Sequence, residues 1–192
     1  LLAPAGITSI DGRGFIGCGV LSRTGWRSIS DTGKVEEWVD ECDRQPEAEA
    51  IGLTGRPDWV VNFVGGWEGK AFVDTDGVRH DVMSDAIRDR ILEELVAGGR
   101  RASDAGARTA WVTWVCPGED SDRNFPDDYP DWINQIMRDA SAQVPDSIVI
   151  EPTDRVCVGG DAEAPPTEEK NEAWNREHHP EDSEWLWQVW LG

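Results

Sequence analysis

Two adjacent histidines near the end of the chain are the strongest candidates for acid–base chemistry. His178 and His179 lie in the segment 175–181 (NREHHPE), directly before an apolar stretch, and His80 is the only other histidine. An imidazole can act as a general base near neutral pH, and Asn175 could orient the His178 ring through a hydrogen bond. An asparagine stabilises an imidazolium less well than a carboxylate does. The alternative interpretation is a solvated loop histidine.

Two glycine turns could supply backbone donors to a developing oxyanion. One glycine turn, 65–66, follows an apolar run directly, and the other is the segment 17–19 (GCG). Backbone N–H groups exposed at such turns can form an oxyanion hole. Alternatively, the glycines serve only to allow turns that need positive φ. The predicted oxyanion and substrate cleft consists of Gly19, Gly65, Gly66, Trp67 and Glu68.

The four cysteines of the chain are widely spaced. They are Cys18, Cys42, Cys116 and Cys157, and none lies in a CxxC pair, which argues against a zinc ribbon. An even number suits two disulfides, for which three connectivities are possible. We expect the pairs nearest in sequence, Cys18–Cys42 and Cys116–Cys157, and therefore an oxidising, extracytoplasmic compartment. Four buried thiols in a cytosolic protein are the alternative.

Three short apolar runs are predicted to be the strands that carry these turns. They are rich in β-branched and aromatic residues and lack a polar face, which is typical of a parallel sheet covered by helices on both sides. The predicted strands are 58–64, 110–115 and 147–150.

Helical spacing of apolar residues recurs between and after these strands. Ser84 is the expected N-cap of the first helix, and Gly98-Gly99 its expected stop, after which the helix could resume through Ala102. The predicted helices are 84–97, 131–142 and 181–191. The alternation of strands and helices predicts a doubly wound α/β fold in a single domain over residues 1–192. The acidic, proline-bearing stretches 119–130 and 161–171 are expected to be surface loops.

The charge of the chain limits its partners. It carries 38 acidic residues against 18 Lys and Arg, a formal net charge of −20. This balance argues against nucleic acid as a partner, because phosphate binding needs clustered cations, and it equally disfavours an anionic membrane surface. A self-repelling, soluble surface is the simplest interpretation, and recruitment of a basic partner is the alternative. We expect no metal site, because adjacent histidines do not share one helix face, and no cofactor.

In order along the chain, these motifs resemble the SGNH-hydrolase superfamily, and more closely the extracytoplasmic SGNH domain fused to bacterial membrane-bound acyltransferases. Residues 57–68 (PDWVVNFVGGWE) are similar to the third conserved block of that family, and residues 16–20 (IGCGV) to the second. Asn175 to His178 stands where the family has DGxH. The final segment 185–191 (WLWQVWL) matches the closing helix.

The resemblance implies a flavodoxin-like three-layer α/β/α sandwich and ester chemistry on O-acylated glycans or small esters. It implies that His178 is the base, that Gly19 gives an oxyanion amide and that Trp67 stands at the third-block position. It also implies a membrane-embedded acyltransferase region as partner. No GDS block precedes Gly17, so we expect the first strand and its nucleophilic serine to be missing from this chain, which starts downstream of them and would be inactive alone.

A second hypothesis is a degenerate domain that binds glycans or acts as a scaffold without catalysis. Asn175 in place of the aspartate favours this hypothesis, as do the 11 tryptophans, because indole rings stack on sugars. Several of these tryptophans lie in the predicted strands and are expected in the core. Trp26, Trp67 and Trp174 lie in predicted loops, where they could line a cleft.

Overall fold

The computed structural model describes residues 9–12, 18–114 and 125–151. Its central feature is a parallel sheet of the strands β3 (Trp59–Phe63), β6 (Arg108–Val112) and β7 (Ile148–Ile150), in the order β3-β6-β7. The pairing aligns Val61 with Ala110 and Ile148, and Phe63 with Val112 and Ile150. The three predicted strands and their parallel arrangement are confirmed.

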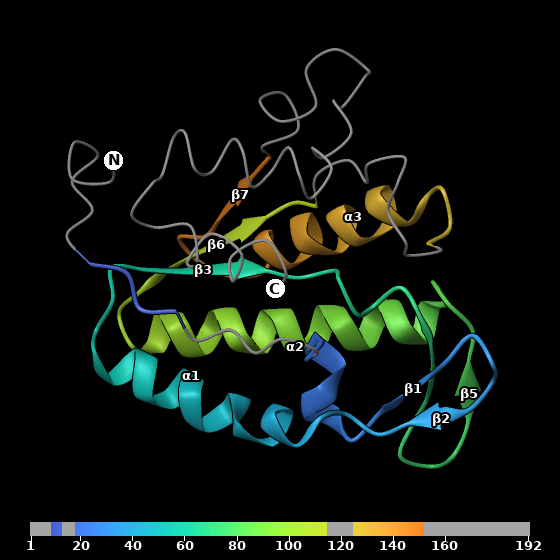
Figure 1. Ribbon diagram of the computed structural model, residues 1–192. Coiled ribbons are helices and arrows are strands. Elements are labelled where there is room, and N and C mark those ends of the chain that lie inside the picture. The colour runs from blue at the N-terminus through green and yellow to red at the C-terminus, as the bar shows by residue number, and fades with distance from the viewer. Residues whose placement is uncertain (1–8, 13–17, 115–124, 152–192) are drawn as a thin grey trace, which may run out of the picture.

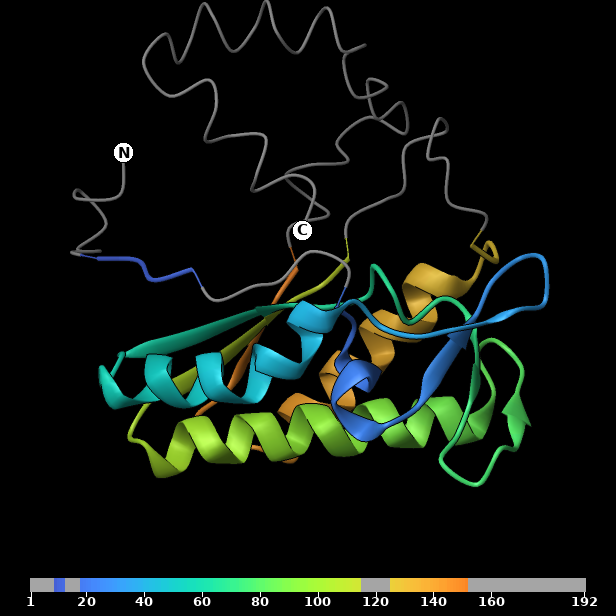
Figure 2. The same cartoon turned by 60° about the horizontal axis from the view of Figure 1, so that its bottom comes forward.

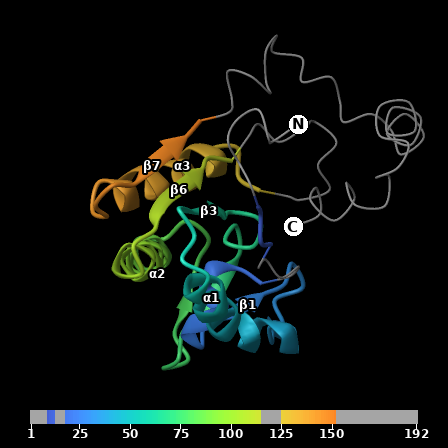
Figure 3. The same cartoon turned by 90° about the vertical axis from the view of Figure 1, so that its left-hand side faces the viewer.

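Two long helices connect these strands. α2 (Asp85–Asp104) joins β3 to β6, and α3 (Tyr129–Ser141) joins β6 to β7. Both connections step in the same direction across the sheet, so right-handed crossovers place both helices on one face. Figures 2 and 3 show α2 and α3 on the same side of the strands. The sequence predicts helices on both faces of the parallel sheet, whereas helices among the described residues cover only one face.

α2 is longer than its sequence predicts. The expected stop at Gly98-Gly99 is wrong, because the helix runs through both glycines to Asp104. Gly99 is buried and lies so close to Val144 and the Trp111 ring that a Cβ there would stand 2.8 Å from Val144 Cγ2. The glycine thus allows α2 to pack closely on its neighbours, and the chain turns only at Gly106, whose φ is +86°.

A small antiparallel sheet lies beside the N-terminal end of α2 (Figure 1). Its strand order is β2-β1-β4-β5. None of its strands, of two or three residues each, is predicted from the sequence. They are β1 (Arg27–Ile29), β2 (Val35–Glu36), β4 (Ala71–Val73) and β5 (Arg79–His80).

Three short helices complete the described fold. η2 (Val20–Thr24) and η3 (Asp40–Arg44) are single 3-10 turns, and α1 (Gln45–Thr54) follows η3 directly. In Figure 3, α1 and α2 lie below β3 and β6. Within the described ranges, no helix is long and apolar enough to cross a membrane.

The hydrophobic core fills the space among α2, α3, the covered face of the parallel sheet and the small sheet. Trp111 of β6 is buried against α2, and Phe72 of β4 joins the same cluster. Burial of such side chains is the main favourable term in folding. The fully buried members are Leu21, Phe72, Ile87, Ile91, Trp111, Tyr129, Ile133, Ile136, Met137 and Ala140.

Candidate functional site

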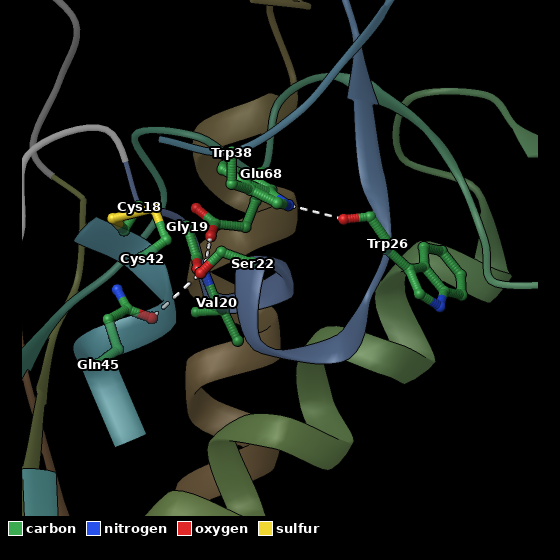
Figure 4. Close-up of a disulfide and its surroundings, with 9 residues drawn as sticks. All are labelled: Cys18, Gly19, Val20, Ser22, Trp26, Trp38, Cys42, Gln45 and Glu68. Carbon is green, nitrogen blue, oxygen red and sulfur yellow. Dashed lines mark hydrogen bonds between the residues drawn. A yellow bond between two sulfur atoms is a disulfide. The ribbon is translucent and has the colours of Figure 1, made fainter. Parts of the chain in front are cut away.

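A disulfide joins the segment around Gly19 to the 3-10 turn η3. Cys18, immediately before Gly19, is bonded to Cys42 in η3, which confirms this predicted pair (Figure 4). The bond is compatible with an extracellular location. The second predicted pair, Cys116–Cys157, lies outside the described residues. The disulfide fixes the start of η2 against η3, so Gly19 has little freedom to move away from its neighbours.

Gly19 is in close contact with the turn 65–68. A Cβ at this position would lie 2.6 Å from Glu68 Oε1 and 2.9 Å from Trp67 Cβ. The Gly19 backbone is ordinary extended chain with φ −82°, so close approach and not conformation requires the glycine here. The structure therefore brings Gly19 together with Trp67 and Glu68, which the sequence predicts in one cleft although they lie far apart along the chain.

Glu68 is the buried acid of this site. Its side chain points inward and is only 2% exposed. Oε1 accepts a hydrogen bond from Val20 N–H at 2.5 Å, and Oε2 accepts from Gly65 N–H at 3.0 Å and Trp67 N–H at 3.2 Å. Burial raises the pKa of the Glu68 carboxyl above its ordinary value, against the opposing effect of these amide donors. Among the described residues no cation is paired with this carboxylate.

The turn 65–68 is held in place at the carboxyl end of β3. Gly65 has φ +122°, and a Cβ there would stand 2.6 Å from Trp114 Cε3. Its carbonyl accepts a hydrogen bond of 2.6 Å from the Tyr129 hydroxyl, which is buried in α3. Carboxyl ends of parallel strands are where open α/β sheets bind ligands. The turn thus stands at the expected place in the fold, with little freedom to adapt.

Gly66 and Trp67, which are also predicted to line the cleft, are less buried than Gly65 and Glu68. Gly66 and Trp67 are half-buried within the turn 66–68. The Lys70 ammonium stands 5.3 Å from the centre of the Trp67 ring, a cation–π contact. Trp38 closes the other side of Gly19, and its indole N–H donates to Trp26 O at 2.6 Å (Figure 4).

The backbone N–H groups of the site differ in whether a described residue accepts their hydrogen bond. Those of Val20, Gly65 and Trp67 are satisfied by Glu68, whereas no described residue accepts a hydrogen bond from Gly19 N–H. The sequence predicts Glu68 on the wall of a cleft, but in the structure its carboxyl group is buried and accepts hydrogen bonds from the backbone around it. An acid directly after a glycine turn is the signal that could have revealed this role.

The predicted base is not part of this geometry. His178 and its expected partner Asn175 lie outside the described residues, and so does Trp174. The described ranges contain no group of three or more His, Cys, Asp or Glu side chains placed to hold a metal ion.

A second polar cluster, which the sequence analysis missed, surrounds His80. His80 Nε2 lies 2.8 Å from Asp74 Oδ2, and the Trp26 ring stacks on the imidazole at 4.8 Å. Asp74 Oδ1 also accepts the N–H groups of Asp76 and Val78. The His80 hydrogen bond is the main cause that lowers the pKa of Asp74. These contacts fix the β4–β5 hairpin; the Asp-x-Asp-Gly turn at 74–77 is their sequence signal.

Comparison of the chain with family models, with curated proteins and with solved structures finds no match.

Proposed function

We propose that this chain is an SGNH-like domain of a carbohydrate O-acyltransferase or esterase, which transfers or hydrolyses acyl esters on cell-envelope glycans outside the cytoplasm. The observation that carries the proposal is the convergence of Gly19 with Gly65–Glu68 at the carboxyl end of β3. The motif resemblance supplies the chemistry, and the disulfide supports the compartment. The proposal includes a flavodoxin-like three-layer sandwich as the complete fold and a membrane-embedded acyltransferase region as partner.

In the proposed reaction, a serine from outside this chain attacks the acyl carbonyl. His178 takes the serine proton as general base and Asn175 orients its ring. When the tetrahedral intermediate collapses, the ester C–O bond breaks and His178 returns the proton to the departing sugar oxygen, which leaves an acyl-serine. Water or an acceptor hydroxyl, deprotonated by His178, then takes the acyl group and frees the serine. Gly19 N–H donates to the oxyanion of the tetrahedral intermediate, since the neighbouring amides are already bonded to Glu68. In this scheme Glu68 is a positioning residue. Its hydrogen bonds hold the backbone next to Gly19 against the turn 65–68.

A second candidate function is glycan binding without catalysis, and the Glu68 carboxylate favours it. When it is ionised, the Glu68 carboxyl opposes the development of a second negative charge at the neighbouring Gly19 amide, because like charges repel most strongly where water is excluded. A neutral sugar would meet no such repulsion. Trp67 offers an indole for stacking on a sugar ring.

An esterase assay on two forms of the protein separates the two functions. The present chain and a form extended upstream to the first GDS-bearing strand are tested for p-nitrophenyl acetate hydrolysis, with and without an acceptor sugar. Ester cleavage by the extended form is expected to disappear in His178→Ala and to persist in the matched control His179→Ala. A folded extended form without hydrolysis or transfer would contradict catalysis and leave the binding function.

A further inference from the structure

Tyr129 is the only tyrosine of the chain and the first residue of α3. Its side chain is completely buried in the core. Its hydroxyl donates a hydrogen bond of 2.6 Å to the carbonyl oxygen of Gly65, the first residue of the turn 65–68. This bond links α3 directly to the turn of the candidate site, and the proposed reaction gives Tyr129 no role.

Aromatic packing fixes the position of this hydroxyl. The Tyr129 ring stacks on the Phe125 ring, with the ring centres 4.7 Å apart and an angle of 12° between the planes. The Trp114 ring stands nearly perpendicular to it at 5.3 Å, and the Trp132 ring is tilted against it at 5.7 Å. A ring packed against three aromatic neighbours cannot swing its hydroxyl away without disturbing the core. Tyr129 is therefore a rigid hydrogen-bond donor.

The peptide that accepts this hydrogen bond has little rigidity of its own. It joins Gly65 to Gly66, and neither residue has a Cβ that would resist rotation of the peptide group. Gly65 has φ +122°, which a glycine adopts without strain. Because Gly65 is buried, its carbonyl oxygen needs a donor from the protein, and a buried carbonyl without one is costly. The Tyr129 hydroxyl therefore favours one orientation of the peptide.

Peptide geometry carries this effect to the Gly66 amide. Every described peptide bond is trans, and in a planar trans peptide the C=O and N–H bonds point in opposite directions. Since the Gly65 carbonyl points toward Tyr129 in α3, the Gly66 N–H points away from α3. The amides on either side, those of Gly65 and Trp67, donate to Glu68. One buried hydroxyl thus sets the direction of an amide in the middle of the predicted cleft.

We propose that Tyr129 is a positioning residue of the candidate site, whose hydroxyl holds the Gly65–Gly66 peptide in the orientation that presents Gly66 N–H to a ligand. The role toward a ligand rests on the proposed glycan-ester function, whereas the orientation of the peptide is measured without a ligand. One such hydrogen bond changes the ratio of two orientations by about two- to tenfold. Apparent affinity falls with the fraction of molecules in the binding orientation, so its loss weakens binding by up to about tenfold.

Removal of this single hydroxyl tests the orientation of the peptide. Tyr129→Phe keeps the aromatic packing, and Thr113→Val is the matched control, because the Thr113 hydroxyl is also buried and donates to a backbone carbonyl, that of Ile150 in β7. ¹⁵N relaxation dispersion on the full chain detects exchange on the microsecond to millisecond timescale. We expect one sharp Gly66 amide resonance in the wild type and in Thr113→Val, and a doubled or exchange-broadened one in Tyr129→Phe. A broadened Gly66 resonance in the wild type, or a sharp one in Tyr129→Phe, would overturn the proposal.

Titration of the same three proteins with an O-acetylated oligosaccharide tests the consequence for binding. Tyr129→Phe is expected to bind up to about tenfold more weakly than the wild type, and Thr113→Val as tightly as the wild type. Equal affinity of Tyr129→Phe and the wild type would overturn the positioning role, even where Gly66 exchanges. Absence of binding to all three proteins would instead contradict the proposed function, and the ligand-free spectra would still decide whether Tyr129 holds the peptide.

Discussion

The substitution Gly19→Ala tests the contact on which the candidate site depends. The backbone at Gly19, with φ −82° and ψ 172°, is open to alanine, so the change itself would add about 0.4–1 kcal/mol of stability by restricting the unfolded chain. The new methyl group, however, would stand 2.6 Å from Glu68 Oε1 and 2.9 Å from Trp67 Cβ. Neither neighbour can retreat, because Glu68 is buried and its other oxygen is held by Gly65 and Trp67 amides.

The size of the effect follows from these contacts. Separating Glu68 from Val20 N–H removes a hydrogen bond to a charged group, which contributes about 1.5–3 kcal/mol. Overpacking adds about 1–3 kcal/mol. After the entropic gain, we expect a net loss of about 1.5–5.6 kcal/mol in the free energy of unfolding, measured by urea titration with tryptophan fluorescence under non-reducing conditions.

A matched control separates this contact from a general effect of alanine. Gly98 lies within α2, and a Cβ there meets only the flexible end of Arg101 at 3.5 Å. Gly98→Ala is expected to gain about 0.5–1 kcal/mol, as is usual inside a helix. A Gly19→Ala protein as stable as the wild type, or more stable, would refute the close packing of Gly19 on the turn 65–68.

Three further predictions concern packing, pH and the disulfide. Gly99→Ala, next to the control position, should lose about 1–3 kcal/mol in the same titration, because its methyl group would collide with Val144; equal stability of the two alanine variants would contradict this packing. Because the pKa of the Glu68 carboxyl is raised in the folded protein, its protonated form favours folding. The stability that this carboxyl contributes is fully present below its unfolded pKa of about 4.3 and is lost as the pH rises through its folded pKa. Unfolding measured from pH 4 to 8 should therefore show the wild type losing stability relative to Glu68→Gln as pH rises, and parallel curves would exclude a raised pKa. Removal of the Cys18–Cys42 bond, which closes a loop with a sequence separation of 24, by Cys18→Ser together with Cys42→Ser should cost about 3 kcal/mol; a variant that unfolds at the wild-type urea concentration would contradict this role.

The parallel strands could be predicted because their signal is strong and local. Runs such as residues 58–64 combine β-branched and aromatic residues over a whole strand, and β3 lies within that range. Their cover could not be predicted in the same way. An apolar strand shows that burial is needed on both faces, but which element buries each face depends on strand order, and the order β3-β6-β7 carries both crossovers to one side.

Short elements and inward-pointing side chains were beyond the sequence signal. Strands of two or three residues, such as β2 and β5, are too short for alternation to be recognised. α1 was missed because its buried face is reduced to Ala48, so no apolar stripe marks it. The position of Glu68 after the glycine turn predicts a place in the cleft, but only the fold shows that its carboxyl group turns inward to three amides.

The most direct test of the proposed site asks whether Gly19 and the turn 65–68 bind one ligand together. A ¹⁵N-labelled protein is titrated with an O-acetylated oligosaccharide, and the amide resonances of the described residues are followed by NMR, with the unacetylated sugar as the matched control. We predict that the acetylated ligand shifts the resonances of Gly19 and of Gly66 and Trp67 together, and that the His80 hairpin is unaffected. Shifts confined to other parts of the fold, or none at millimolar ligand, would contradict a glycan-ester site at the carboxyl end of β3.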